Sequence, residues 1–173
     1  ISAKQIVGNG IQWGISKEKK LFLKANSYKI NQLFANIYSS NIPPKDTKRR
    51  PLFSEKLREI KFDLGIKQFQ LVNSKLEYEE DAAKGPGTSK LTFSNINTTI
   101  QNINSGYNKK SLPDVKVDWQ SQFMTGNLKA NWTFNPMNRT EKFNINGSIT
   151  NLDTKNMDPF IKPYLNVSVD GTF

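Results

Sequence analysis

The chain has 173 residues and a formal net charge of +10, and it contains neither cysteine nor histidine. This length suits one domain of ordinary size, which we place over residues 1–173. The missing residue types exclude disulfides, thiol catalysis and any Ser-His-Asp or Cys-His mechanism within the chain. A Ser-Lys pair or a carboxylate dyad stays possible in principle, but no stretch offers a candidate site. We therefore expect no enzyme, and no catalytic, cofactor-binding or metal-binding residues.

Two features indicate a piece of a longer protein. The chain begins at Ile1 and stops at Phe173, within an alternating apolar and polar run. No apolar run inside it approaches the roughly 18 residues that a membrane-spanning helix needs. A membrane anchor in the parent protein stays open, because such a segment is easily lost by trimming.

The excess positive charge lies in the first 75 residues, which hold 15 Lys+Arg against 5 Asp+Glu. Its densest part belongs to a loop over residues 41–52 that also contains Pro43-Pro44. Two interpretations compete: a solvated loop, or contact with an anionic surface. Lipid headgroups suit this cluster better than nucleic acid, because no aromatic side chains are interleaved with it and no RNA-binding motif is present. The candidate surface-contact residues are Lys45, Lys48, Arg49 and Arg50.

The first third of the chain alternates in the manner of strands. We expect one strand from Lys4 to Ser16, with a bulge or close backbone approach at its glycines. A charged turn and a strand over 20–25 follow, and then 26–38, where a strand or a short helix is possible. Phe53 to Ile60 predicts a two-turn helix with Ser54 as its N-cap. This helix either connects elements at an open end of the sheet or carries Lys56 and Arg58 towards a membrane.

The middle of the chain contains a hairpin between Asn73 and Ile100. Its first strand ends in the run 73–80 and its second covers 91–100, with the loop 81–90 between them. Period-2 alternation gives each strand one apolar face. The phase of the alternation changes near Val72, which indicates a bulge or a turn there, and it changes again before Ile96. Alternation over 60–66 predicts a further strand upstream.

The last third predicts three more strands and a crossover. Residues 115–120 alternate, Gly126-Asn127 suits a tight turn, and 128–134 return. Residues 143–149 form the next strand, 153–164 an irregular or helical crossover, and 165–173 a last strand. In total we expect nine to eleven strands with one or two short helices.

The fold class is therefore all-β and mainly antiparallel, as a curled sheet, an open β-groove or a sandwich. A second sheet, closure or a bound lipid could cover its apolar side, and the pattern does not choose among them. For Trp119 and Trp132 we favour core packing over a ligand-stacking platform of the carbohydrate-binding kind. The acidic run at 77–81 fits a solvated strand edge better than a Ca²⁺ site. The candidate core or lipid-facing residues are Phe62, Leu64, Ile66, Leu76, Tyr78, Leu91, Phe93, Val117, Trp119, Ala130, Trp132, Phe134, Phe143, Ile145 and Val167.

Several stretches resemble the AsmA-like family of bacterial envelope proteins, in its long Bacteroidetes-type versions. They are 62–80 (FDLGIKQFQLVNSKLEYEE), Gly87 with 90–97 (KLTFSNIN), 143–149 (FNINGSI), 157–160 (MDPF) and 167–171 (VSVDG). The resemblance covers about residues 60–173 and consists of strands and turns, without a catalytic signature.

This resemblance implies a periplasmic β-groove, related to TamB-like proteins, in a parent anchored in the inner membrane. It implies a role in phospholipid transport or outer-membrane assembly, with phospholipid, the membrane surface or other envelope proteins as partners. The alternative is a closed β-sandwich that acts as a scaffold or binds protein or glycan without lipid. That alternative predicts Leu64, Phe93, Trp132 and Ile145 buried against a second sheet.

Overall fold

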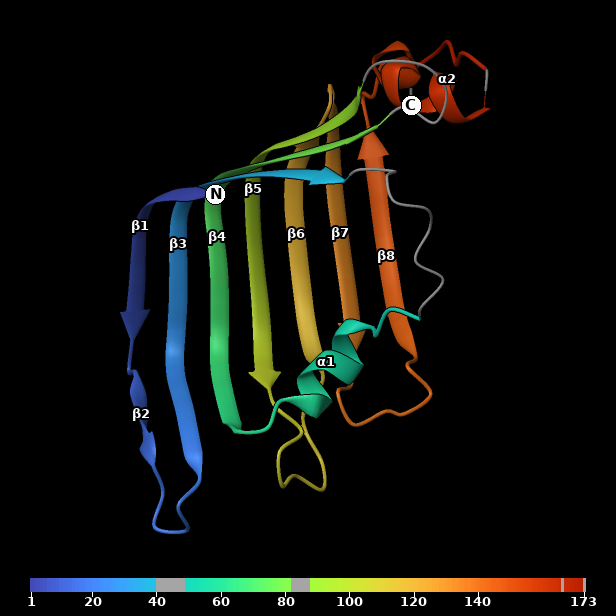
Figure 1. Cartoon of the computed structure of the whole chain (residues 1–173). Coiled ribbons are helices and arrows are strands. Elements are labelled where there is room, and N and C mark those ends of the chain that lie inside the picture. Colours follow the sequence, from blue (N-terminus) through green and yellow to red (C-terminus); the bar gives the residue numbers. More distant parts are fainter. Residues whose placement is uncertain (40–48, 82–87, 166, 173) are drawn as a thin grey trace.

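The computed structural model describes residues 1–39, 49–81, 88–165 and 167–172, and the arrangement of the elements is seen in Figure 1. Strands dominate, with two short α-helices and one 3₁₀ turn. In chain order the elements are β1 (Ser2–Asn9), β2 (Gln12–Ile15), β3 (Leu21–Ser39), α1 (Phe53–Glu59), β4 (Asp63–Asp81), β5 (Thr88–Asn104), β6 (Val115–Phe123), β7 (Gly126–Phe134), β8 (Phe143–Thr150), η1 (Thr154–Met157) and α2 (Asp158–Leu165).

All eight strands belong to one sheet in the order β1-β3-β4-β5-β6-β7-β8, and β2 pairs with β3 beyond the end of β1. Every pair is antiparallel except β3 and β4, which are parallel. A parallel pair needs a long crossover, and α1 lies within the connection that provides it. The sheet is open and does not close into a barrel. This confirms the all-β, mainly antiparallel class with short helices.

A row of left-handed residues crosses the three long strands. Gln32, Asn73 and Asn95 have φ angles of 51°, 49° and 51°. Gln32 and Asn73 are aligned by the β3–β4 register, and the β5 ladder shifts beside Asn95. Such bulges reverse the side-chain phase and bend the strand. They account for the phase changes that the sequence shows near Val72, where a bulge or a turn was expected, and before Ile96.

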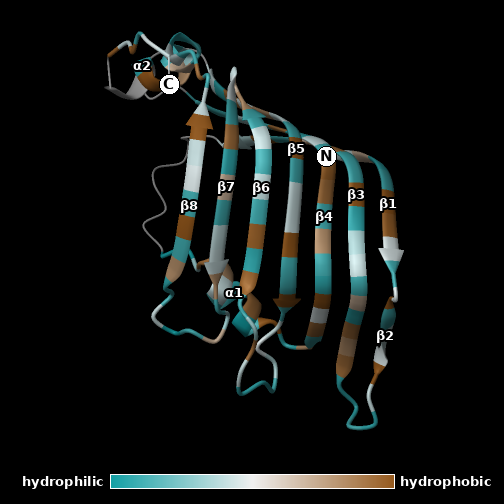
Figure 2. Cartoon of the chain, turned by 180° about the vertical axis from the view of Figure 1, so that it is seen from behind, coloured by the Kyte–Doolittle hydropathy of each residue, from teal (hydrophilic) through white to brown (hydrophobic). Residues whose placement is uncertain are grey.

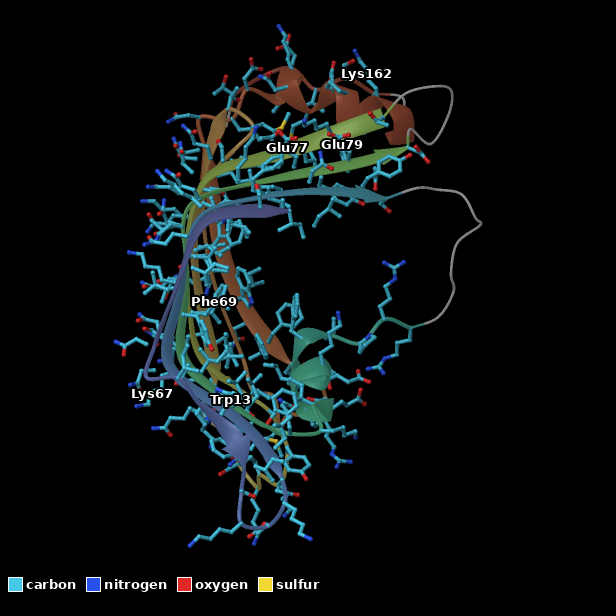
Figure 3. The ribbon with its side chains drawn as sticks, turned by 60° about the vertical axis from the view of Figure 1, so that its left-hand side comes forward. Trp13, Lys67, Phe69, Glu77, Glu79 and Lys162 are labelled. Atoms are coloured by element: carbon cyan, nitrogen blue, oxygen red, sulfur yellow. The ribbon has the colours of Figure 1, made fainter. Side chains whose placement is uncertain are left out.

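The bend keeps the apolar side chains on one face. Below the row this face carries Leu71 on β4, and above it Leu76, five residues further on, continues the face opposite Phe93. In side view the sheet curves like the letter C (Figure 3). From behind, brown and teal bands alternate along the strands, as period-2 patterning requires (Figure 2). The result is a concave apolar face and a polar convex one.

The fully buried apolar core is small for this chain length. The remaining apolar residues of the concave face are half-buried or exposed, because within the described ranges only α1, and no second sheet, lies over it. The buried apolar residues are Ala25, Ala35, Ile96, Val115, Val117, Phe123 and Leu152.

Helix α1 has no side-chain N-cap, and polar contacts of its residues hold it against the concave face. Leu52 occupies the N-cap position without a side-chain hydrogen bond, so the predicted Ser54 cap is wrong. Ser54 is instead buried and its hydroxyl donates to Glu141. Arg58 forms an ion pair with Glu141 at 2.5 Å and donates to the carbonyl of Pro136 at 2.8 Å. These contacts place α1 over the sheet and direct Arg58 away from any outside surface.

Three further expectations need correction. The strand predicted over 4–16 breaks at Gly10, whose φ of +62° ends β1 before β2 begins. The two segments predicted over 20–25 and 26–38 form one strand, β3, because both pair with β4 along their length. The turn predicted at Gly126-Asn127 lies at Met124-Thr125, and Gly126 already pairs with Phe123.

The strand predicted over 165–173 is also wrong for the residues that the structure describes. Helix α2 extends to Leu165, and an isolated bridge between Thr172 and Asp153 is the pairing found there. The irregular or helical structure predicted over 153–164 is confirmed as η1 and α2, but no described strand follows them, so they do not form a crossover. Ser89 of β5 donates to the carbonyl of Pro159 at 2.7 Å, which seats α2 against β5. No described helix has the length and apolar character needed to cross a membrane.

Candidate functional site

Rows of apolar side chains run across the strands of the concave face. One row can be followed through consecutive cross-strand partners from β3 to β8 without a charged member. The row crosses six strands, and its five spacings of about 4.8 Å give it a length of about 24 Å; with β1 the whole sheet is about 29 Å wide in this direction. We call this concave face the apolar groove. The row consists of Tyr28, Phe69, Ile100, Val117, Trp132 and Ile145.

Two pockets lie where α1 faces the groove. They have volumes of about 230 and 200 Å³ and share Phe53, Trp132 and Phe134 in their walls. The first also contacts Phe143 and Ile145 at the β8 edge, and the second extends towards β5. The second is lined by Phe53, Lys56, Leu57, Ile100, Ile103, Val115, Val117, Trp132 and Phe134. Together they form an apolar space that spans β5 to β8 beneath one helix.

The walls of these pockets reach solvent. Phe53 is 68% exposed, Phe143 56% and Ile145 60%. Single exposed apolar residues are ordinary, whereas large contiguous apolar patches are typical of interaction sites or ligand-binding grooves in soluble proteins. The sandwich alternative required Ile145 to be buried with Leu64, Phe93 and Trp132. Ile145 is exposed, the other three are half-buried, and no described element forms a second sheet.

The polar groups around the pockets are mostly engaged within the protein. Hydrogen bonds from Ser54 and then Arg58 lower the pKa of the Glu141 carboxyl, so Glu141 stays ionised and paired. Lys56 differs, since its ammonium lies 5.6 Å from the centre of the Phe53 ring and has no ion pair within the described part of the chain. The second pocket therefore has apolar walls and one cation at its rim.

Most of the predicted apolar face lies in the groove. Leu76, Tyr78, Leu91 and Phe93 are neighbours on the upper arms of β4 and β5. The Phe93 ring packs edge-on against Trp119 with centroids 6.3 Å apart, which favours core packing for that tryptophan. The remaining groove residues by register are Leu64, Ile66, Val117, Ala130, Trp132, Phe134, Phe143 and Ile145.

Two of the predicted residues lie outside the groove strands. Phe62 precedes β4, and Val167 follows α2, where it is 47% exposed and belongs to no strand. Sequence reasoning also missed the groove residues of α1, Phe53 and Leu57. Their i, i+4 spacing predicts a helix with one apolar face, but nothing local says which part of the sheet that face meets.

The predicted anionic-surface cluster is only partly described. Lys45 and Lys48 lie outside the described residues. Arg49 forms an ion pair with Glu55 at 2.6 Å, near the start of α1, while Arg50 is exposed. The guanidinium of Arg49 thus donates two hydrogen bonds to Glu55 of the helix.

Two members of the acidic run at 77–81, Glu77 and Glu79, form an ion-pair network on the polar face. Lys75 and Lys90 lie 2.7 and 2.8 Å from the Glu77 carboxylate, and Lys90 also contacts Glu79 at 3.3 Å. Hydrogen bonds from both lysines lower the pKa of Glu77 to about 2. Both glutamates lie on the upper strands in Figure 3. Within the described ranges no three acidic side chains are grouped so that they could hold a metal ion.

Comparison of the chain with family models, curated proteins and solved structures found no match.

Proposed function

We propose that this chain is a periplasmic β-groove segment of an AsmA-like envelope protein, and that its apolar groove binds phospholipid acyl chains. The proposal includes a role in lipid transport or outer-membrane assembly, in a parent anchored in the inner membrane. The observation that carries it is the uninterrupted apolar row from β3 to β8, left open to solvent at Ile145.

The dimensions of the groove suit an acyl chain. A bilayer's hydrocarbon core is about 30 Å thick, so one extended chain spans about 15 Å. The sheet, about 29 Å wide across its strands, accommodates that length along the row. Burial of each methylene contributes about 0.8 kcal/mol and needs no polar partner. A surface without directional polar groups is what such a ligand requires, and Lys56 at the rim supplies a cation within reach of an anionic headgroup.

A charge placed on the groove face tests this function. Ile145→Asp introduces a carboxylate into the first pocket, and Asn146→Asp places the same group one residue away, on the opposite face of β8. Both positions are exposed, so both variants should fold. We expect Ile145→Asp to weaken binding of a fluorescent phospholipid at least about tenfold, because the variant loses the free energy of burying one large apolar side chain against the lipid. Asn146→Asp should bind as the wild type does.

Native mass spectrometry of the purified chain supplies an independent measurement. Copurified phospholipid that is depleted in Ile145→Asp supports the proposal. A wild-type chain that neither retains nor binds phospholipid would refute it and leave the scaffold or protein-binding alternative. Equal binding by the two variants would show that lipid contacts another surface.

A further inference from the structure

The hairpin formed by β2 and the start of β3 carries a second group of apolar side chains, at the opposite edge of the sheet from the pockets beneath α1. Trp13 pairs with Leu23 and Ile15 with Leu21, so these four side chains share a face. The turn that joins the strands is closed by a hydrogen bond from the Ser16 amide to the Lys20 carbonyl, 2.8 Å long. In Figure 1 this hairpin extends past the ends of the other strands, at the lower left.

The large apolar side chains at the tip of this hairpin are unusually exposed. Trp13 is 76% exposed, Ile15 73% and Leu21 50%. Trp13 lies on the lower arm of the sheet in side view (Figure 3). A ladder of four cross-strand pairs fixes these side chains on one face, so they cannot collapse onto the chain to avoid water. A rigid apolar tip of this kind requires an apolar environment.

The charges around the tip indicate which apolar environment it favours. Lys17 and Lys19 have no ion-pair partner within the described ranges. The neighbouring carboxylates are already neutralised: Glu18 pairs with Lys20 at 2.7 Å, and Asp63 with Lys24 at 2.8 Å and Lys109 at 3.3 Å. The tip therefore presents an apolar face beside unpaired ammonium groups, and its surroundings have no free carboxylate to repel an anion.

A bilayer with anionic headgroups matches both properties. Tryptophan prefers the boundary between headgroups and acyl chains. Lysines beside it gain from the negative potential of an anionic leaflet. We propose that the β2–β3 hairpin docks this protein on an anionic membrane surface, with Trp13 and Ile15 inserted and Lys17 and Lys19 at the headgroup phosphates. This docking site does not depend on lipid in the groove, and either could exist without the other.

Cosedimentation of the whole chain with vesicles tests the docking. We expect binding to vesicles of equimolar phosphatidylglycerol and phosphatidylcholine, little binding to phosphatidylcholine alone, and a decrease as salt is added. Trp13→Ala should weaken binding at least about tenfold. Replacing Lys17 and Lys19 together by alanine should cost about fivefold for each lysine. A double Lys67→Ala and Lys116→Ala variant matches the charge change on the polar face and should bind within about twofold of the wild type.

Brominated acyl chains separate the hairpin from the groove. They quench tryptophan fluorescence at short range, and Trp13→Phe removes the hairpin's fluorophore while Trp119 and Trp132 remain in the groove strands. Quenching lost in Trp13→Phe supports docking through the hairpin, whatever the groove binds. Equal vesicle binding by Trp13→Ala and wild type would overturn the proposal. So would a wild-type dimer in solution that Trp13→Ala dissociates, because a second copy would then cover this face.

Discussion

The variant Gly106→Ala tests whether α1 packs against the sheet as described. A Cβ atom at this position would lie 2.9 Å from the Arg58 Cα and 3.0 Å from the Arg58 carbonyl oxygen, both backbone atoms of α1. The Gly106 amide also donates to the Leu57 carbonyl at 3.1 Å. Gly106→Ala therefore forces the helix away from the loop and lengthens that hydrogen bond.

Two opposing effects set the size of the change. Overpacking against atoms that cannot rotate away costs about 1–3 kcal/mol. Replacing glycine by alanine at a position without a positive φ stabilises the folded state by about 0.4–1 kcal/mol through the unfolded chain. Overpacking is the larger effect, so we expect a net loss of about 1–2 kcal/mol. For a domain of this length that lowers the melting temperature by about 2–8 °C.

Thermal and urea unfolding measure this loss, with Gly65→Ala as the matched control. A Cβ at Gly65 would meet the Asn104 and Lys24 side chains at 3.3 and 3.4 Å, and both can rotate away. This control should be as stable as the wild type or slightly more stable. If Gly106→Ala unfolds like Gly65→Ala, then α1 does not contact the loop at Gly106, and the pockets beneath the helix lose their support.

Two other predictions concern the ion-pair network and the bend in the sheet. The folded-state pKa of Glu77 is lowered to about 2, so its contribution to stability is complete above the ordinary carboxyl value of 4.5 and is lost as pH falls through about 2. Glu77→Gln should therefore lose less stability than the wild type between those pH values in acid titrations of the unfolding free energy, and parallel curves would contradict this. Asn95 has a φ of 51°, so Asn95→Val should cost about 1–2 kcal/mol in urea unfolding while Asn95→Gly stays close to the wild type. Equal stability of the two variants would mean that the strand does not need the left-handed conformation.

The sequence determined the local features of this protein. Alternation in 91–100 and 128–134 marked strands and apolar faces, since successive side chains of a strand point to opposite sides whatever lies beside it. The phase changes near Val72 and before Ile96 lie beside Asn73 and Asn95, whose left-handed backbone reverses the alternation; the sequence left a bulge or a turn open at the first and only a change of phase at the second. The absence of cysteine and histidine restricted the chemistry before any fold was known.

Only the tertiary structure decided which elements join and what covers them. Residues 20–38 became one strand because β4 pairs along its whole length, and the phase break within it had suggested two elements. The alternation in 165–173 does not produce a strand in the described residues. A strand needs a hydrogen-bonded neighbour, and the described residues of this segment pair only through the bridge at Thr172. Ser54 fits an N-cap by residue type, yet its hydroxyl donates a hydrogen bond to Glu141, 87 residues away.

The same limit applies to the groove. Periodicity gives each strand an apolar face, but a sealed core and an open groove have the same periodicity. The outcome depends on contacts between distant segments, here α1 against β5 to β8 and the absence of a second sheet over the described strands. That arrangement leaves Ile145 and Trp13 exposed for the two lipid contacts proposed here.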